Sequence, residues 1–306
     1  MTKRLSRREF LTTIEAIGLT AALDGFNWSR AADEAAETIR PKKVDALEVA
    51  PSITITHCCD PQLGFGEANT PEEAYAADLA RLLKEVELLN ELKPDLVLYA
   101  GDMTNRWQEV AKDWPEILKS IKAPLLVAPG NHDIPDPVKG SVVKVFTDVF
   151  GKEYDSIVLN GWKIIAINSQ YVRPTEEKTL YDAQVEWFRR ELEDAKASGL
   201  RSIVASHVPP FVKTLDEKDE YFNFPSTLRQ SFLDYLVAND ATFYLAGHTH
   251  TTLERDYRGV PILNGETTSR NFDRRDFGFR LLKIDEKLNF TWDFVEVQKN
   301  VAAAKS

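Results

Sequence analysis

Three apolar, strand-like runs separated by long helical segments constrain the fold of this chain more than any other feature. The runs are residues 53–59, 95–100 and 123–128, and each is rich in β-branched or aliphatic side chains. Helical patterns occupy the intervals between them, at residues 70–92 and 107–121. Strands that are joined by helices pair in parallel through right-handed crossovers. The first half of the chain therefore predicts a layered α/β fold.

The connections change character in the second half of the chain. Alternating residues on both sides of Asn160-Gly161 predict a β-hairpin, because this dipeptide favours a tight turn with positive φ. We expect three further helices and six further strands, at 142–150, 182–198 and 225–239 and at 201–206, 242–246, 252–257, 260–263, 279–284 and 290–297. The last four strands follow one another closely. They predict a second sheet packed on the first, within one domain of residues 46–298.

The composition is that of an ordinary globular protein and excludes several classes. The chain has 306 residues, 43% hydrophobic and 28% charged. A net charge of −10 argues against a nucleic-acid polymer as partner. Since no run of about 18 apolar residues occurs, we expect no membrane-spanning segment. The two cysteines, Cys58 and Cys59, are adjacent and cannot easily bridge, so we expect two buried strand residues; a redox or ligand role for Cys59 is the alternative.

The N-terminus has the pattern of an export signal. Arg7 and Arg8 form a twin-arginine pair within a basic head, followed by a short, weakly apolar run. We therefore expect residues 1–31 to be a twin-arginine-type signal segment, 32–45 a linker and 299–306 a tail. Such a signal engages the export machinery for folded proteins, which predicts a periplasmic or extracellular location. The alternative is an amphipathic N-terminal helix of a cytoplasmic protein.

Polar side chains follow five of the predicted strands, at the point where each strand ends. They are Asp60 and Gln62, Asp102 and Asn105, Asn131 and His132, His207, and His248 and His250. Four of the five histidines of the chain belong to this set. Ligands of open α/β sheets bind at the carboxyl ends of strands, and carboxylates, amide oxygens and imidazoles suit hard or borderline divalent ions. The pattern predicts a site for two metal ions.

Two further residues are interpreted from their position relative to the strands. Gly130 precedes Asn131, and we expect it to adopt a backbone conformation that most residues avoid, so that the chain turns sharply off the strand. His57 lies inside the first predicted strand. We interpret it as a packing residue of the core rather than as a functional one.

In this order, the motifs D-x-Q, G-D-x-x-N, G-N-H-D, H-x-P and G-H-T-H resemble those of the calcineurin-like metallophosphoesterases. The resemblance covers roughly residues 53–285. Residues 60–64, 168–170 and 219–223 further resemble a branch of the family that contains a complete serine/threonine protein phosphatase. The resemblance implies a four-layer αββα sandwich of mixed sheets around a dinuclear metal site.

The resemblance also implies which residues hold each ion. One ion would be held by Asp60, Gln62, Asp102 and His250, and the other by Asp102, Asn131, His207 and His248. The two ions, about 3.5–4 Å apart, would share a hydroxide that attacks phosphorus in line. They would be Mn, Fe, Zn or Mg. Mn is favoured because most relatives carry histidine where Gln62 stands, and an amide oxygen is a harder, weaker ligand.

Catalytic and substrate-binding roles follow from the same resemblance. His132 would steady the phosphoryl oxygens or protonate the leaving group, and Asn105 would orient it. Many relatives carry aspartate at this position. Because Asn105 is neutral, it cannot raise the pKa of His132 by charge. Arg270 and Arg274 could clamp phosphate, or their loop could simply be solvated. Tyr221 could form a lid or substrate wall, or pack against the domain.

The function expected from the whole sequence is metal-dependent phosphoester hydrolysis, with a phosphomonoester as the favoured substrate. One alternative is a phosphodiesterase acting on small nucleotides or lipid-derived diesters. Another, from a different class, is a non-catalytic metal-binding scaffold protein. The presence of every implied ligand favours the enzyme, whereas the sequence leaves the substrate open.

Overall fold

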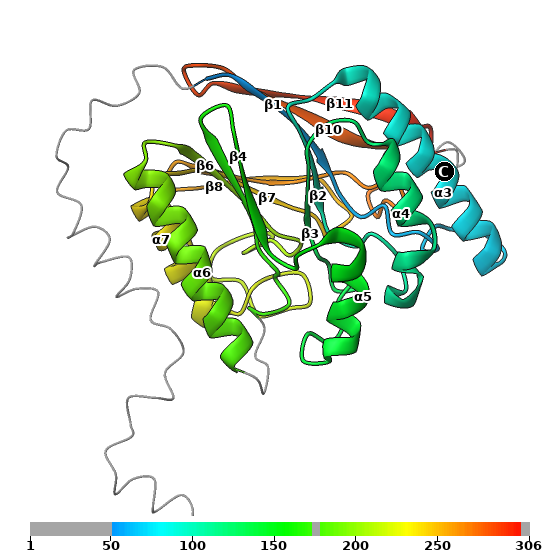
Figure 1. The fold of residues 1–306 in the computed structure, drawn as a ribbon, viewed down its shortest axis with the longest axis horizontal. Helices are drawn as coiled ribbons and strands as arrows, with labels where there is room; N and C mark the ends of the chain where they lie inside the picture. The colour runs from blue at the N-terminus through cyan, green and yellow to red at the C-terminus, as the bar shows by residue number, and fades with distance from the viewer. Residues whose placement is uncertain (1–50, 173–177, 301–306) are drawn as a thin grey trace, which may run out of the picture.

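Residues 51–172 and 178–300 are described by the computed structural model, in which two β-sheets pack face to face between outer helices (Figure 1). The predicted signal segment and linker lie outside the described residues, as do residues 301–306 of the predicted tail. Within the described residues, no helix has the length and apolar composition needed to cross a bilayer.

The first sheet contains the three parallel strands that the sequence predicts. Its order is β11-β10-β1-β2-β3, with β1 (Ile53–Cys58), β2 (Leu96–Ala100), β3 (Leu125–Ala128), β10 (Phe277–Ile284) and β11 (Phe290–Gln298). β1 pairs in parallel with β2, and β2 with β3, while β10 joins the other edge of β1 in antiparallel register. The carboxyl ends of β1, β2 and β3 therefore lie side by side at one edge.

The second sheet has six strands in the order β4-β5-β6-β7-β9-β8. They are β4 (Asp155–Leu159), β5 (Trp162–Ala166), β6 (Arg201–Ala205), β7 (Ala241–Ala246), β8 (Leu253–Tyr257) and β9 (Val260–Asn264). The predicted hairpin is confirmed: β4 and β5 are antiparallel, and the turn residues Asn160 and Gly161 have φ of 48° and 77°. β5, β6, β7 and β9 are parallel, so this sheet also presents several carboxyl ends together.

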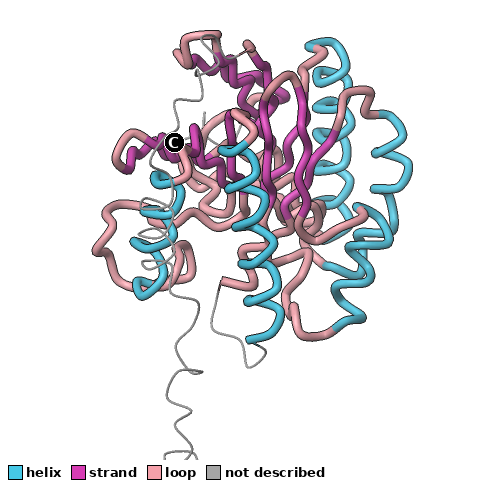
Figure 2. Tube along the Cα trace, turned by 60° about the vertical axis from the view of Figure 1, so that its left-hand side comes forward, coloured by secondary structure: helices cyan, strands magenta, loops and turns pink. Residues whose placement is uncertain are grey.

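Helices cover the outer face of each sheet, which confirms the αββα arrangement (Figures 1 and 2). On the first sheet lie α3 (Pro71–Leu92), the short 3₁₀ helix η1 (Trp107–Glu109), α4 (Val110–Ser120) and α5 (Gly140–Phe150). On the second lie α6 (Lys178–Ala197) and α7 (Ser226–Ala238). α6 begins four residues before the predicted start, at Lys178 rather than Asp182, and Tyr181 of this extra turn packs against the core.

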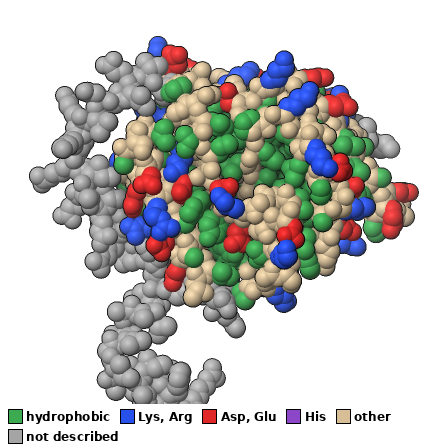
Figure 3. Space-filling view, in the orientation of Figure 1, with side chains coloured by type: hydrophobic (Ala, Val, Ile, Leu, Met, Phe, Trp, Pro, Cys, Tyr) green, Lys and Arg blue, Asp and Glu red, His purple; other side chains and the backbone are tan. Residues whose placement is uncertain are grey.

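Three apolar clusters fill the layers, one between the sheets and one under each set of helices. Ile55 and Leu98 of the first sheet meet Ile164, Ile203 and Phe243 of the second in the middle layer. Burial of apolar area at roughly 25 cal/mol per Å² makes these layers the main source of stability. On the face of the molecule in Figure 3, side chains of Lys and Arg are interspersed with those of Asp and Glu.

The first strand and the residue that follows it contain the residues that were interpreted as packing. His57 is 1% exposed, and Cys58 and Cys59 are buried free thiols. The His57 ring lies 3.2 Å from the Cys59 sulfur, and burial followed by the charge of Arg280 lowers the pKa of His57 to about 3. His57 is therefore a neutral core residue, as expected.

Candidate metal centre

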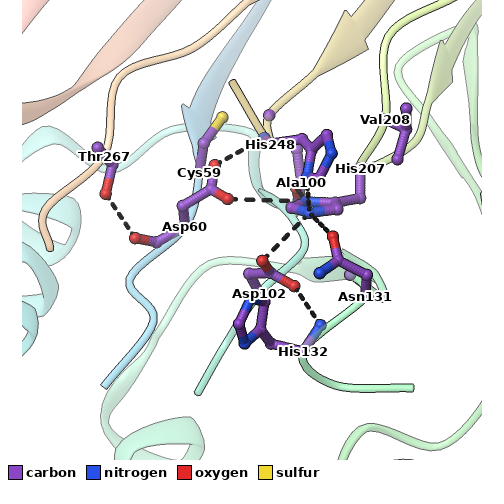
Figure 4. Close-up of polar contacts among 12 residues, drawn as sticks. Cys59, Asp60, Ala100, Asp102, Asn131, His132, His207, Val208, His248 and Thr267 are labelled. Atoms are coloured by element: carbon purple, nitrogen blue, oxygen red, sulfur yellow. Dashed lines mark hydrogen bonds and ion pairs between the residues drawn. The ribbon is translucent and has the colours of Figure 1, made fainter. Parts of the chain in front are cut away.

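The loops after five strands converge at the shared edge of the two sheets. They bring together Asp60 after β1, Asp102 after β2, Asn131 after β3, His207 after β6, and His248 after β7 (Figure 4). Asp60, Asp102, His207 and His248 are each at most 3% exposed. Ligand atoms of Asp102, His207 and His248 lie within 4.8 Å of one another. The structure thus places in one cluster the residues that the sequence predicts as ligands of the second ion.

Three potential ligand atoms lie close to a fourth, the Nε2 atom of His207. The His207 Nε2 atom lies 3.2 Å from Asn131 Oδ1, 3.3 Å from Asp102 Oδ2 and 3.0 Å from His248 Nδ1. Two oxygens and two nitrogens at such separations match the mixed ligand set of a borderline divalent ion.

Main-chain carbonyls fix the tautomers of the histidines. His207 Nδ1 lies 2.8 Å from the Ala100 carbonyl, His248 Nε2 lies 2.9 Å from the Tyr221 carbonyl, and His250 Nδ1 lies 2.5 Å from the Arg270 carbonyl. A carbonyl only accepts, so each of these nitrogens carries the hydrogen. In neutral rings the opposite nitrogens present lone pairs, and those of His207 and His248 face each other. A positive charge between them, either a proton on His207 or a metal ion, removes this repulsion, so the residues fit a metal ion.

The residues predicted for the first ion contain buried acceptors without protein partners. Among the described residues, Asp60 Oδ1 and Gln62 Oε1 are buried and accept no hydrogen bond. An orphaned buried acceptor costs about 1–3 kcal/mol. His250 Nε2 lies 3.5 Å from Asp60 Oδ1. A hard divalent ion would satisfy both oxygens, so this part of the centre also fits a metal.

The charges of the centre favour a positive charge in its middle. Burial alone would lower the pKa of His207, but the carboxylates of Asp102 and Asp60 outweigh burial and raise this pKa to about 9. Burial would likewise raise the pKa of Asp102, but His207 and His132 hold it well below its usual range.

Five predicted ligands adopt left-handed backbone conformations, which residues other than glycine rarely adopt. The φ angles are 48° for Asp60, 32° for Gln62, 52° for Asp102, 71° for His248 and 51° for His250. Each such residue costs on the order of 1–3 kcal/mol, and such strain concentrates at functional sites. Hydrogen bonds between the loops hold this geometry, including one from the His248 N–H to Asp60 Oδ2 at 2.9 Å.

Glycines beside the ligands are required for close approach. A Cβ atom on Gly130 would lie 2.0 Å from Asp102 Oδ1, and one on Gly101 would lie 2.5 Å from His207 Nδ1. The prediction that Gly130 adopts a conformation avoided by other residues is wrong, because its φ is not positive, unlike the 85° of Gly101. Gly130 is needed instead because the Asp102 side chain occupies the space of a Cβ atom.

His132 lies at the edge of the cluster, and its main chain is hydrogen-bonded to Asp102 of the cluster. The His132 N–H donates to Asp102 Oδ1 at 2.8 Å, and the Nδ1 atom lies 2.9 Å from the main-chain carbonyl of Asn105. The expected orienting contact from Asn105 therefore comes from its backbone. Its side-chain amide donates instead to the Gly64 carbonyl at 3.2 Å. Since Nδ1 donates, Nε2 is the His132 nitrogen left to face a substrate.

The three predicted substrate residues differ in their relation to the centre. The Tyr221 hydroxyl accepts a hydrogen bond from Asn131 Nδ2 at 2.8 Å, and its ring lies 4.7 Å from that of His248. Arg270 forms an ion pair with Glu67 at 2.9 Å. Arg274 is exposed, and within the described part of the chain it has no hydrogen bond or ion pair to the predicted ligands.

The sequence analysis assigned no role to three buried charged residues that hold the loops of the centre: Asp133, Asp78 and Arg81. Asp133 is fully buried, and its carboxylate accepts from the N–H groups of Met103 at 2.8 Å and Gly130 at 2.9 Å, which ties two ligand loops together. On α3, Asp78 and Arg81 form a buried ion pair. Charged residues at positions where a helix faces the core were the available signal.

Comparisons with known proteins agree with this geometry. A family model described as calcineurin-like phosphoesterase matches residues 53–252. The serine/threonine-protein phosphatase CPPED1 of Rattus norvegicus is 26% identical over 243 residues, covering 74% of this chain and 78% of that protein. A probable cyclic nucleotide phosphodiesterase of Rhodococcus erythropolis is 25% identical over 202 residues, covering 63% of this chain and 64% of that protein.

Among solved structures, a dimetal phosphatase from Danio rerio has the same fold. Its TM-score is 0.57 at 13% identity, and the match covers 81% of this chain and 98% of that one. The family model spans well over half of the 306 residues and includes all five ligand loops. The chain belongs to the calcineurin-like phosphoesterase family and is a hydrolase that acts on phosphoric ester bonds.

Proposed function

We propose that this protein is a phosphomonoesterase that uses two divalent metal ions, with Mn²⁺ the favoured metal. The observation that carries the proposal is the inward orientation of the ligand atoms. His207 Nε2 and His248 Nδ1 are 3.0 Å apart, with both outer nitrogens held by carbonyls, and the buried oxygens of Asp60 and Gln62 lack partners. Burial of these oxygens is costly unless cations lie beside them.

The protein groups then have separate tasks in hydrolysis. Asp60, Gln62, Asp102 and His250 would hold one ion, and Asp102, Asn131, His207 and His248 the other. Bound there, the ions supply positive charge to the phosphoryl oxygens and make water nucleophilic at neutral pH. His132 lies beside the cluster, and Nδ1 is held by the main-chain carbonyl of Asn105. When the ring carries a proton on both nitrogens, Nε2 can give its proton to the leaving oxygen.

The comparisons support a monoester more than a diester. The similarity to the protein phosphatase covers 74% of this chain, whereas the similarity to the cyclic nucleotide phosphodiesterase covers 63%. Diester hydrolysis is the second candidate because of that latter similarity. The oxygen-rich first site, with Gln62 in place of an imidazole, supports Mn²⁺ or Mg²⁺ there.

The test compares 4-nitrophenyl phosphate with bis(4-nitrophenyl) phosphate, on protein stripped of metal and reloaded with Mn²⁺, Mg²⁺ or Zn²⁺. We expect metal-dependent turnover with a higher kcat/KM for the monoester. Asp102→Asn should lose Mn²⁺ binding and turnover together, whereas Asp148→Asn, at an exposed position of α5, should change neither. Preference for the diester would establish the second candidate, and metal binding without turnover of any ester would establish a non-catalytic protein.

We also propose that the protein is exported through the twin-arginine pathway. The basis is the sequence pattern of residues 1–31, which lie outside the described residues. Replacing Arg7 and Arg8 by lysine should abolish export in a bacterial host with this pathway. Equal amounts of protein outside the cytoplasm with and without the change would refute the proposal.

A further inference from the structure

One side of the reaction site is an aromatic wall, formed by Phe65 and Phe272. The Phe65 ring lies 6.0 Å from the ring of His132 and 5.4 Å from that of His250. Phe272 stacks on His250 at 4.8 Å with an angle of 25° between the rings, and it meets Phe65 edge-on at 6.5 Å. The wall thus adjoins both the candidate metal centre and the proposed proton donor.

Two loops carry the wall, and a buried ion pair on α3 fixes both of them. The Asp78 carboxylate accepts hydrogen bonds from the N–H groups of Gly64, Phe65 and Gly66 at 2.9–3.0 Å. Its partner Arg81 donates from Nε to the Thr268 carbonyl at 2.5 Å. The N–H of Phe272 donates to the His250 carbonyl at 3.1 Å. The wall is therefore held in place before any ligand arrives.

The wall is apolar and carries no net charge. The Phe272 side chain is 48% exposed, although it lies on a fixed loop beside a reaction centre. The Arg270 guanidinium lies 5.5 Å from the Phe65 ring and 5.8 Å from the Phe272 ring, and Glu67 neutralises it at 2.9 Å. A fixed, exposed aromatic surface is typical of a binding site for a flat, apolar group.

We infer that the substrate is an aryl phosphomonoester, whose aromatic leaving group packs on Phe65 and Phe272. This inference rests on the proposed function, because it takes the phosphoryl group to lie at the metal centre. The ester oxygen then faces His132. In the reaction the P–O bond to the aryl oxygen breaks, and a P–O bond to a water oxygen forms. The aryl oxygen takes its proton from His132, water restores that proton, and the products are a phenol and inorganic phosphate.

The test measures binding of non-hydrolysable phosphonates to the Mn²⁺-loaded protein, so that leaving-group chemistry plays no part. Benzylphosphonate mimics an aryl phosphate, ethylphosphonate lacks the ring, and 2-hydroxyethylphosphonate adds a polar group. We expect benzylphosphonate to bind roughly tenfold more tightly than either of the others, as one good aromatic contact allows. Phe272→Ala and Phe65→Leu should reduce this ratio several-fold and leave ethylphosphonate binding unchanged.

A matched control is Phe290→Ala, because Phe290 is also an exposed phenylalanine but begins β11 opposite Ile284, at the end of the sheet far from the centre. It should leave the ratio unchanged. Equal binding of all three phosphonates by the unmodified protein would overturn the inference, even if monoesters are hydrolysed. A ratio that survives both wall substitutions would also overturn it. Failure of the proposed function would appear differently, as turnover of no ester.

Discussion

Tyr221→Phe tests whether one hydroxyl group orients a metal ligand. Asn131 could present either its oxygen or its NH₂ group to the candidate centre. The Tyr221 hydroxyl accepts from Nδ2 at 2.8 Å, so the Oδ1 atom faces His207 Nε2 at 3.2 Å. The substitution removes this acceptor, while the main-chain carbonyl of residue 221 still binds His248 Nε2 at 2.9 Å. It therefore perturbs Asn131 and leaves the contact of His248 in place.

The expected magnitude follows from the exposure of the group. An intramolecular hydrogen bond contributes a net 0.5–1.5 kcal/mol, roughly. Tyr221 is 50% exposed, so water can replace part of the lost contact, and the lower part of that range applies. About 0.5–1 kcal/mol corresponds to Mn²⁺ affinity weakened about 2–5-fold. Only the ion held by Asn131 should be affected.

The assay is titration of metal-free protein with Mn²⁺, followed calorimetrically and by competition with a chelator of known affinity. Tyr257→Phe is the matched control, because it too removes a hydroxyl that forms a side-chain hydrogen bond. The Tyr257 hydroxyl donates to Asp234 at 2.7 Å, on β8 away from the centre. It should leave Mn²⁺ affinity unchanged. Unchanged affinity in Tyr221→Phe would refute the orienting role, and complete loss of one ion would show that the hydroxyl does more than orient Asn131.

Three further substitutions separate the parts of the centre. Gly130→Ala should abolish binding of both ions and turnover, because the added Cβ would lie 2.0 Å from Asp102 Oδ1; dialysis against Mn²⁺ checks this. Gln62→His should tighten the weaker ion about tenfold if Gln62 is a ligand, and an unchanged titration would exclude it. His132→Ala should keep both ions while kcat falls by roughly 10²-fold, more for an alkyl phosphate than for 4-nitrophenyl phosphate. Equal loss for both esters would instead indicate electrostatic stabilisation of the phosphoryl group.

The positions of the candidate ligands could be predicted because they depend on local pattern and simple topology. A polar residue directly after a buried strand must lie at the carboxyl edge of the sheet, whatever the details of packing. Asp60, Asp102 and Asn131 follow three parallel strands, so their convergence needed only the strand order β1-β2-β3. His207 and His248 required one more inference, that the second sheet packs with its carboxyl ends at the same edge.

The supporting contacts could not be predicted, because they depend on distances between segments remote in sequence. Asn105 meets His132 through its backbone rather than its side chain, and no residue pattern distinguishes the two. Gly130 was correctly singled out for the wrong reason, since its closest neighbour comes from the loop after another strand. Asp78 and Arg81 act on loops 12–14 and about 187 residues away.

The features that lower the stability of the protein without bound ions are the same features that suit the centre to metal binding. Left-handed backbone conformations of the predicted ligands and orphaned oxygens at Asp60 and Gln62 both reduce stability. The apolar layers between and outside the sheets lie away from this edge, and their burial compensates for this loss of stability. An ion present at 100 times its Kd returns about 2.7 kcal/mol to the folded state. Metal binding therefore offsets the stability cost at the site that causes it. The rest of the fold holds the loops in position before the ions bind.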